Sequence, residues 1–470
     1  MPEHEPPRRS STVRFGAKLA VVAVVVCVAV YFITLADLQR TLKHSLSRLH
    51  AGGVPMTWAQ TAPAPVPDEE NAAVLYEQAC AGLRVSRQER NLLAQFARGD
   101  PSRDPEALRQ NVEQIIARER PALELLKRGA RKPGCRIPLS ERVMLIPGDR
   151  TLLIALRTCG DLLAADAVSA AYRGDTEEVL AACRTALRLS EQASYSDVGY
   201  FFTGARMRMR AMDALRQVLE RSELDPATYE SLFRQLSASD LNAALRAATY
   251  NDAYRVLWRF EAVERQPDQA RLLLADQKDA WHVIRISWGA RLYLSPLAKQ
   301  LRLKEEIVRI SLMEQDLALA ERPYRDLKHQ WPALRKRYDR LPRYYMMPAD
   351  PLCDLEAALV RDDAVAISGA MQIALALKAY RAKFGAYPDS LDALRTYPGG
   401  AWAASDTQRS RIQRWAVPED PFSGKAFAYR RKGAGFVLYS WGEDLDDDGG
   451  RLSDPGRYPP DGDMVWECLR

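Results

Sequence analysis

An uncharged apolar run near the N-terminus constrains this chain more than any other feature of its sequence. Residues 19–36 read LAVVAVVVCVAVYFITLA and include no charged side chain. Together with Phe15, Gly16 and Ala17, the run has about the length that a helix needs to cross the hydrocarbon core of a bilayer. Backbone groups in lipid can bond only to one another, so we expect a helix despite the many valines. The sequence therefore predicts a transmembrane helix at residues 15–36.

Basic side chains on the short N-terminal side of this run indicate its orientation. Those before the run are Arg8, Arg9, Arg14 and Lys18, and those soon after it are Arg40, Lys43 and Arg48. Positive charge gathers on the cytoplasmic side of a span, which favours a cytoplasmic tail at residues 1–14 and a C-terminal bulk outside the cytoplasm. A cleaved signal peptide is the alternative. The run is long for one and no A-x-A site follows it, so we expect an uncleaved anchor.

A spacer separates the anchor from the folded part of the chain. Residues 37–67 comprise a juxtamembrane segment that can continue as an amphipathic helix, then Gly52-Gly53 and the run TAPAPVP. Alternating Ala and Pro force an extended, water-facing linker. Beyond it, apolar residues recur at helical spacing and no convincing strand appears. Residues 68–346 are therefore predicted to form a helical domain.

One passage of this domain has a sharper internal pattern. Residues 162–191 read as two amphipathic helices joined at Gly174-Asp175, where Gly permits the reversal and Asp can cap the second helix. Small side chains such as Ala182 and Ala186 let the two helices approach closely. The passage resembles a tetratricopeptide-type helical hairpin. No second copy recurs at a fixed period, so an ordinary helical hairpin is the favoured interpretation.

The last part of the chain, residues 354–470, changes pattern. A long helix with an apolar face is ended by Gly385, and two alternating segments at 426–430 and 435–440 predict a β-hairpin. Residues 463–467 offer a final strand. The predicted fold class is thus mainly α: a transmembrane helix, a helical domain, and a small α+β module made of a long helix and an antiparallel sheet.

The order of these motifs resembles the C-terminal domain of the major pseudopilin of type II secretion systems. The resemblance rests on LKAYRAKFGAYPDSLDAL, on DPFSGK at 420–425, and on YSWG at 439–442 with the acidic stretch that follows. It implies a bacterial envelope protein, with the anchor in the inner membrane. Pseudopilins carry a cleavage signal at the start of the anchor and pack into filaments through a helix that runs into the span. Here Gly16 is followed by AKLAV and the module lies over three hundred residues from the span, so filament membership is not expected.

Acidic side chains after YSWG form the pattern with the clearest chemistry. Three Asp residues alternate before Gly449, as in the first half of a D-x-D-x-D-G calcium loop, while Pro455 at the closing position excludes an EF-hand. In the pseudopilin family this loop binds calcium, and the resemblance implies a cage closed from the next segment and helped by a hydroxyl or a backbone carbonyl. The predicted calcium ligands are Asp444, Asp446, Asp448, Asp461, Asp463 and Ser440. A solvated acidic turn is the alternative.

Other chemistry has little support in this sequence. A net charge of +6 over 470 residues is too weak to indicate nucleic acid, and no nucleic-acid partner is expected. The patterns HExxH, GxxxxGK[ST], GxSxG and GxGxxG are absent. Seven cysteines occur without a CxxC pair. Cys27 lies in the span, and the pairing of the other six stays open.

Three hypotheses about the function remain. The leading hypothesis is a membrane-anchored binding or scaffold protein of the bacterial envelope, whose helical domain contacts a protein partner. The alternatives are an envelope hydrolase with a carboxylate site in the helical domain, and a secretion or pilus-like accessory protein. A deep pocket with two or more carboxylates favours the enzyme. A shallow, extended, concave helical surface favours binding.

We predict that the full chain is an integral membrane protein with its C-terminus outside the cytoplasm. A reporter that is active only in the cytoplasm should therefore be inactive when fused after Arg470, and alkaline carbonate should leave the protein in the membrane pellet. An active fusion, or full extraction by carbonate, would contradict the predicted topology.

Overall fold

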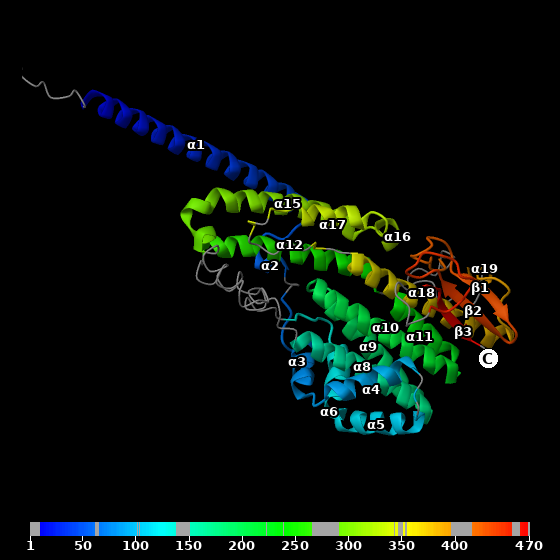
Figure 1. Cartoon of the computed structure of the whole chain (residues 1–470). Helices are drawn as coiled ribbons and strands as arrows, with labels where there is room; N and C mark the ends of the chain where they lie inside the picture. Colours follow the sequence, from blue (N-terminus) through cyan, green and yellow to red (C-terminus); the bar gives the residue numbers. More distant parts are fainter. Residues whose placement is uncertain are drawn as a thin grey trace, which may run out of the picture. The chain divides into compact units, whose positions relative to one another are not determined.

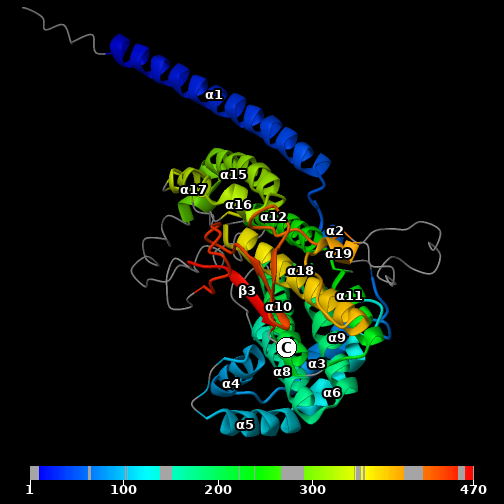
Figure 2. The same cartoon turned by 90° about the vertical axis from the view of Figure 1, so that its right-hand side faces the viewer.

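The computed structural model describes most of the chain as helix (Figures 1 and 2). The described residues are 10–61, 65–100, 102, 104–137, 151–221, 223–237, 239–265, 291–342, 344–345, 351–352, 355–395, 416–453 and 461–468. They group into two compact units. The first comprises Met1–Val54, Val256–Glu314 and Leu341–Ala349, and the second comprises Pro55–Arg255, Gln315–Arg340 and Asp350–Arg470.

The first unit contains the predicted membrane anchor. Helix α1 (Ser10–Ala51) is continuous through the whole predicted span and through the juxtamembrane segment, and Gly53, with a φ of 91°, lies just beyond its end. No residue of its most apolar stretch is buried by the rest of the protein. The helix is long and apolar enough to cross a membrane, as the sequence predicted.

Helix α15 (Lys299–Ala320) begins in the first unit and lies beside α1 there. The Nε2 of Gln300 donates to the backbone oxygen of Tyr31 at 2.8 Å, and Arg48 pairs with Glu314 at 3.0 Å. These two contacts, one near each end of the shared stretch, set α15 alongside α1. The short 3-10 helix η1 (Pro296–Ala298) leads into α15.

Buried polar bonds link α15 to helix α12 (Leu241–Arg265), which also ends in the first unit. Arg302 donates to Glu264 at 2.8 Å and to the backbone oxygen of Ser295 at 2.9 Å. The hydroxyl of Tyr293 donates to Glu305 at 2.7 Å. Each of these buried donors therefore has an acceptor. The helices α12 and α15 can pack together without leaving these polar groups unpaired.

The second unit holds the rest of the helices and the sheet. Its helices, besides parts of α12 and α15, are α2 (Trp58–Thr61), α3 (Ala72–Gly82), α4 (Arg87–Arg98), α5 (Pro105–Arg118), α6 (Arg120–Ala130), α8 (Thr151–Arg173), α9 (Thr176–Ala193), α10 (Val198–Arg221), α11 (Pro226–Ser237), α16 (Tyr324–Leu327), α17 (Trp331–Asp339), α18 (Leu355–Phe384) and α19 (Asp392–Arg395). Between residues 68 and 346, the described part of the chain contains no named strand, which agrees with the predicted helical middle.

Helices α8 and α9 form the hairpin that the sequence predicted at residues 162–191. Gly174 turns the chain with a φ of 73°, and the carboxylate of Asp175 accepts from the backbone N–H of Glu178 at 3.0 Å. The next helix, α10, packs against both. At Gly204 an added Cβ would lie 2.5 Å from the backbone oxygen of Ser190, so only glycine permits this close approach of α9 and α10.

The C-terminal module is built as the sequence predicted, from one long helix and a small antiparallel sheet. The sheet order is β1 (Ala428–Lys432), β2 (Gly435–Ser440), β3 (Met464–Cys468), with Lys432 opposite Gly435 at the hairpin. Helix α18 packs its apolar side chains against β2 and β3 and ends at Gly385, whose φ is 80°.

The helical pattern from Asp104 to Arg128 is interrupted once, because α5 ends at Arg118 and α6 begins at Arg120. Pro121 explains the break, since proline lacks the N–H that would bond to the carbonyl four residues earlier. The division into domains at 68–346 and 354–470 stays a prediction. The compact units are distributed otherwise along the chain.

A buried arginine joins α18 to the segment between α15 and α16. Arg361 is 1% exposed and donates to Asp362 at 2.7 Å, to the backbone oxygen of Ala320 at 2.9 Å and to that of Arg322 at 2.7 Å. Removing one partner of such a group leaves the other polar groups buried, without a hydrogen-bond partner and without water.

We therefore predict that Arg361→Ala lowers the free energy of unfolding by about 3–5 kcal/mol in urea denaturation of the full chain. The matched control is Arg206→Ala, which breaks an exposed ion pair between α10 and Glu356 of α18. That control should lower the free energy of unfolding by less than about 1 kcal/mol. Equal losses of unfolding free energy in the two variants would show that the buried bonds of Arg361 contribute no more than an exposed ion pair.

Candidate functional site

The loop between β2 and β3 gathers three of the six predicted metal ligands. One carboxylate oxygen from each of Asp444, Asp448 and Asp461 lies within 4.8 Å of the others. The loop bends sharply to achieve this. Leu445 has a φ of 71°, in the left-handed region that non-glycine residues seldom adopt. Gly462 supports the fold of the loop by donating its N–H to Asp444 at 2.5 Å.

The other three predicted ligands lie outside this cluster. Asp446 is exposed and accepts from the N–H of Asp447 at 2.9 Å. Asp463 is buried and accepts from the N–H of Gly450 at 2.6 Å, and burial raises its pKa. Ser440 donates to Asp420 at 2.6 Å. These three groups shape the loop.

Asp420 organises this end of the sheet, although it is not among the predicted ligands. Its carboxylate is buried and accepts from the backbone N–H groups of Phe422 and Ser423, each at 3.1 Å, and of Trp441 at 3.3 Å. The DPFSGK motif is the available signal, because Asp before Pro commonly bonds to the backbone of its own turn.

The three clustered carboxylates fit a hard cation. Oδ2 of Asp448 is buried and has no hydrogen-bond partner in the described structure. Arg451 lies beside the cluster, 2.6 Å from Asp448 and 3.3 Å from Asp461. Its half-exposed guanidinium supplies positive charge to carboxylates that would otherwise repel one another. A calcium ion takes carboxylate oxygens of this kind as ligands.

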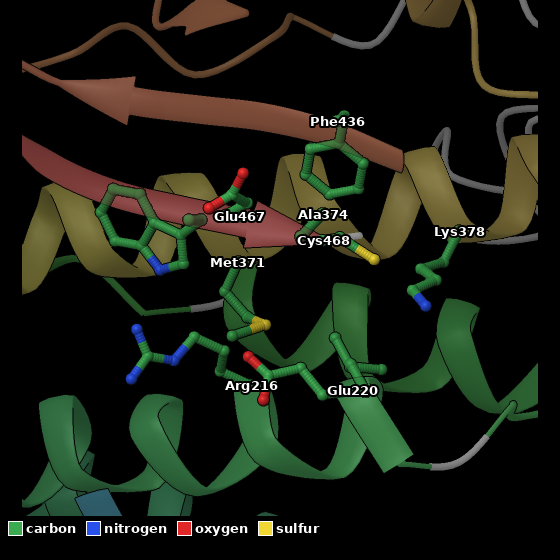
Figure 3. A pocket seen from close by; sticks show the side chains of 10 residues that line it. Arg216, Glu220, Met371, Ala374, Lys378, Phe436, Glu467 and Cys468 are labelled. Atoms are coloured by element: carbon green, nitrogen blue, oxygen red, sulfur yellow. The ribbon is translucent and has the colours of Figure 1, made fainter. Parts of the chain in front are cut away.

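An apolar pocket lies between α10, α18 and strands β2 and β3 (Figure 3). Its cavity volume, the space that can hold the centre of a water-sized group, is about 30 Å³. Its apolar lining consists of Leu219, Met371, Ala374, Phe436 and Trp466, and its polar lining of Arg216, Glu220, Lys378, Glu467 and Cys468. Figure 3 shows Met371 lying between α18 and α10 at the centre of this group.

The pocket has two carboxylates, but neither is placed for acid–base catalysis. Glu220 and Glu467 are both exposed, and Glu467 pairs with Lys432. A general acid or base at neutral pH needs a pKa shifted by burial or by a close charge.

A buried carboxylate, Asp166, lies elsewhere, among α6, α8 and α9, beside the partly exposed Glu178. Asp166 is fully buried, 3.8 Å from Lys127 and 3.9 Å from Arg120, while Lys127 lies 2.6 Å from Glu178. Burial first, and then the charge of Glu178, raises the pKa of Asp166 to about 6. Because three helices enclose it, Asp166 is not accessible to a substrate in this structure. The cluster is best understood as an interior ion network.

The C-terminal module matches the model of a known protein family. The family model described as "Type II secretion system (T2SS), protein G" matches residues 361–454, from the first turns of α18 to just beyond the acidic loop. The match covers about a fifth of the chain and confirms the resemblance of this module to a pseudopilin. No curated protein and no solved structure matches the chain.

The raised pKa of Asp166 predicts a pH dependence of stability. The folded state binds more protons than the unfolded state between about pH 4 and pH 6, so stability falls as the pH rises through that window. Asp166→Asn should remove this fall and raise the free energy of unfolding by about 2 kcal/mol at pH 7.5, with little change at pH 4.

Urea denaturation at the two pH values measures this difference. The control is Glu124→Gln, which alters an exposed partner of the same Lys127. That variant should keep the slope of the original chain. If the Asp166→Asn variant also keeps this slope, the ionisation of Asp166 is not the cause of the pH dependence.

Proposed function

We propose that the chain is a membrane-anchored binding or scaffold protein of the bacterial envelope. Its bulk lies on the outer side of the inner membrane. It serves a secretion or pilus-like machine as an accessory and does not join a filament as a subunit. The observation that carries this proposal is the burial of α18, the long helix of the pseudopilin-like module.

Helix α18 is covered on two sides by its own chain. Met371, Leu375 and Ala379 belong to the core that also contains side chains of α8, α9, α10 and α11. Ile373 and Leu377 belong to the core that contains the sheet. A pilin-type subunit offers its long helix to neighbouring subunits, and here that surface is already occupied.

The position of the anchor supports the same conclusion. The apolar span lies within α1 (Ser10–Ala51), whereas α18 begins only at Leu355, so the module's helix does not continue into the membrane. The segment after Gly16 also lacks the pseudopilin cleavage signal. The module is thus combined with a helical body and used as part of a larger binding surface.

Calcium is the proposed cofactor of the acidic loop. Asp444, Asp448 and Asp461 would hold the ion, and Asp448 already presents a buried oxygen without a partner. The ion would cancel the repulsion among these carboxylates and tie the loop after β2 to the segment before β3. Its binding energy would then become folding energy of the module.

We predict that calcium at a hundred times its dissociation constant stabilises the full chain by about 2.7 kcal/mol. Replacing Asp444 and Asp448 together by Asn should abolish that response, because the two amide side chains are close in size to the carboxylates but carry no charge. Melting curves in calcium and in chelator, with calorimetric titration, measure the effect.

Asp446→Asn is the matched control for this loop. It removes an acidic group two positions from Asp444 and from Asp448, but from outside the cluster, so the calcium response should persist. A chain that melts identically in calcium and in chelator would reduce the loop to a solvated acidic turn.

Chemical cross-linking in intact cells tests the function itself. The full chain should co-purify with other envelope proteins in fixed proportion, with cross-links that map to the exposed faces of the helical body. A regular ladder made only of copies of this chain would instead indicate a filament subunit and contradict the proposal.

A further inference from the structure

Two cysteines from distant parts of the sequence meet inside the second unit. Cys80 lies near the end of α3 and Cys159 lies on α8, and their sulfur atoms are 3.8 Å apart across a separation of 79 residues. Wide spacing in the sequence gave no indication of this pair.

From this geometry we infer that Cys80 and Cys159 form a structural disulfide that fastens α3 to the core of the helical body. The inference rests on the proposed extracytoplasmic location, because disulfides persist in oxidising compartments. Closing the gap to about 2 Å requires a shift of one or both side chains, and helices α3 and α8 already pack together.

The reaction requires a disulfide oxidant, either an oxidoreductase of the compartment or a small-molecule disulfide. The thiolate of Cys80, which is half-buried, attacks one sulfur of the oxidant and releases the other as a thiol. Cys159 then attacks the Cys80 sulfur of the mixed disulfide and releases the second sulfur. Two electrons and two protons pass to the oxidant. Cys159 is placed for the second step, because its sulfur lies 3.8 Å from that of Cys80.

The position of α3 gives the cross-link a role. α3 (Ala72–Gly82) is the first long helix after the Pro/Ala linker that connects the body to the anchor. A force along that linker is applied to α3 before any other long helix of the body. A covalent bond to α8 would keep α3 packed against the body under such a force. This suits a protein that holds a partner at a membrane.

The test uses the full chain in two arms. In the first arm, the protein is taken from cells with its free thiols blocked, digested without reductant and searched for the Cys80–Cys159 linked peptide. In the second arm, reduced purified protein is treated with oxidised glutathione and digested in the same way. Reduction of the linked protein should lower the melting temperature by about 5–10 °C.

Each outcome bears on a different claim. A linked peptide in both arms supports the disulfide and the location. A link in the second arm alone supports the pair and counts against the proposed orientation. Absence of the link in both arms overturns the inference. Cys183→Ala, which removes another buried thiol, should leave the link intact, and Cys80→Ala should abolish it.

A separate observation in the first unit carries a second inference, about the membrane surface. Leu292 and Leu297 are 65% and 81% exposed, on the turn that precedes α15. The hydroxyl of Tyr31 lies 3.5 Å from the backbone oxygen of Pro296 in this turn, and Gln300 bonds to Thr34 at 2.7 Å. Tyr31 and Thr34 belong to the apolar span, so these contacts fix the depth of the turn.

We propose that this turn inserts its two leucines into the lipid boundary of the bilayer. Tyr31 lies five residues before the end of the apolar run at Ala36, or about 7.5 Å along the helix. Amphipathic elements at interfaces bury their apolar groups to about 5–10 Å, which is the same depth. Further along, α15 runs beside α1 to the contact between Arg48 and Glu314, well beyond the span.

An environment-sensitive fluorescent amino acid at position 297 tests this inference in vesicles of phosphatidylethanolamine and phosphatidylglycerol. Lipids with brominated chains should quench it at least several-fold more than the same probe at Ser311, an exposed site further along α15. Equal quenching at the two positions would overturn the proposed insertion.

Discussion

The burial of α18 on two faces is the constraint on which the second unit depends. One row of its side chains completes the core of the helical body, and another row completes the core beneath the sheet. Each large apolar side chain buried in this way contributes roughly 1.5–3 kcal/mol. Since a single rigid helix belongs to both cores, the pseudopilin-like module cannot separate from the helical body without exposing both.

Buried polar groups make this arrangement specific. Arg208 of α10 is 2% exposed and donates to Ser368 of α18 at 2.8 Å and to the backbone oxygen of Leu236 at 3.0 Å. Burial lowers its pKa to about 10. Arg361 makes a comparable set of bonds nearer the start of α18. An unpaired buried guanidinium is costly, so these bonds favour one register of α18 against its neighbours over any other.

The sequence predicted those features that local signals define. Gly174, Gly385 and Gly433 mark turns through a left-handed backbone, and the alternating pattern at 435–440 marks a strand, so the hairpin of helices, the end of α18 and the β-hairpin were all expected. The uncharged run predicted α1 for the same reason. Each of these signals acts within a few residues of the structure that it specifies.

Features that depend on distant contacts were beyond sequence reasoning. Nothing near Met371 indicates that α10 covers it, and nothing near Asp166 indicates that Lys127 lies beside it. The acidic loop could be predicted from the sequence only in part. Its composition pointed to a cation, but only the path of the chain selects Asp444, Asp448 and Asp461 and directs Asp463 and Ser440 to other partners.

The most direct measurement is a photo-crosslink from the buried face of α18. A diazirine analogue of methionine at Met371, placed in the full chain in its native membrane, reacts with whatever covers that face. The account predicts a cross-link within the same chain, to α10 between Arg216 and Glu220. A cross-link from Met371 to a second copy of the chain would show that α18 is a filament surface and would contradict it.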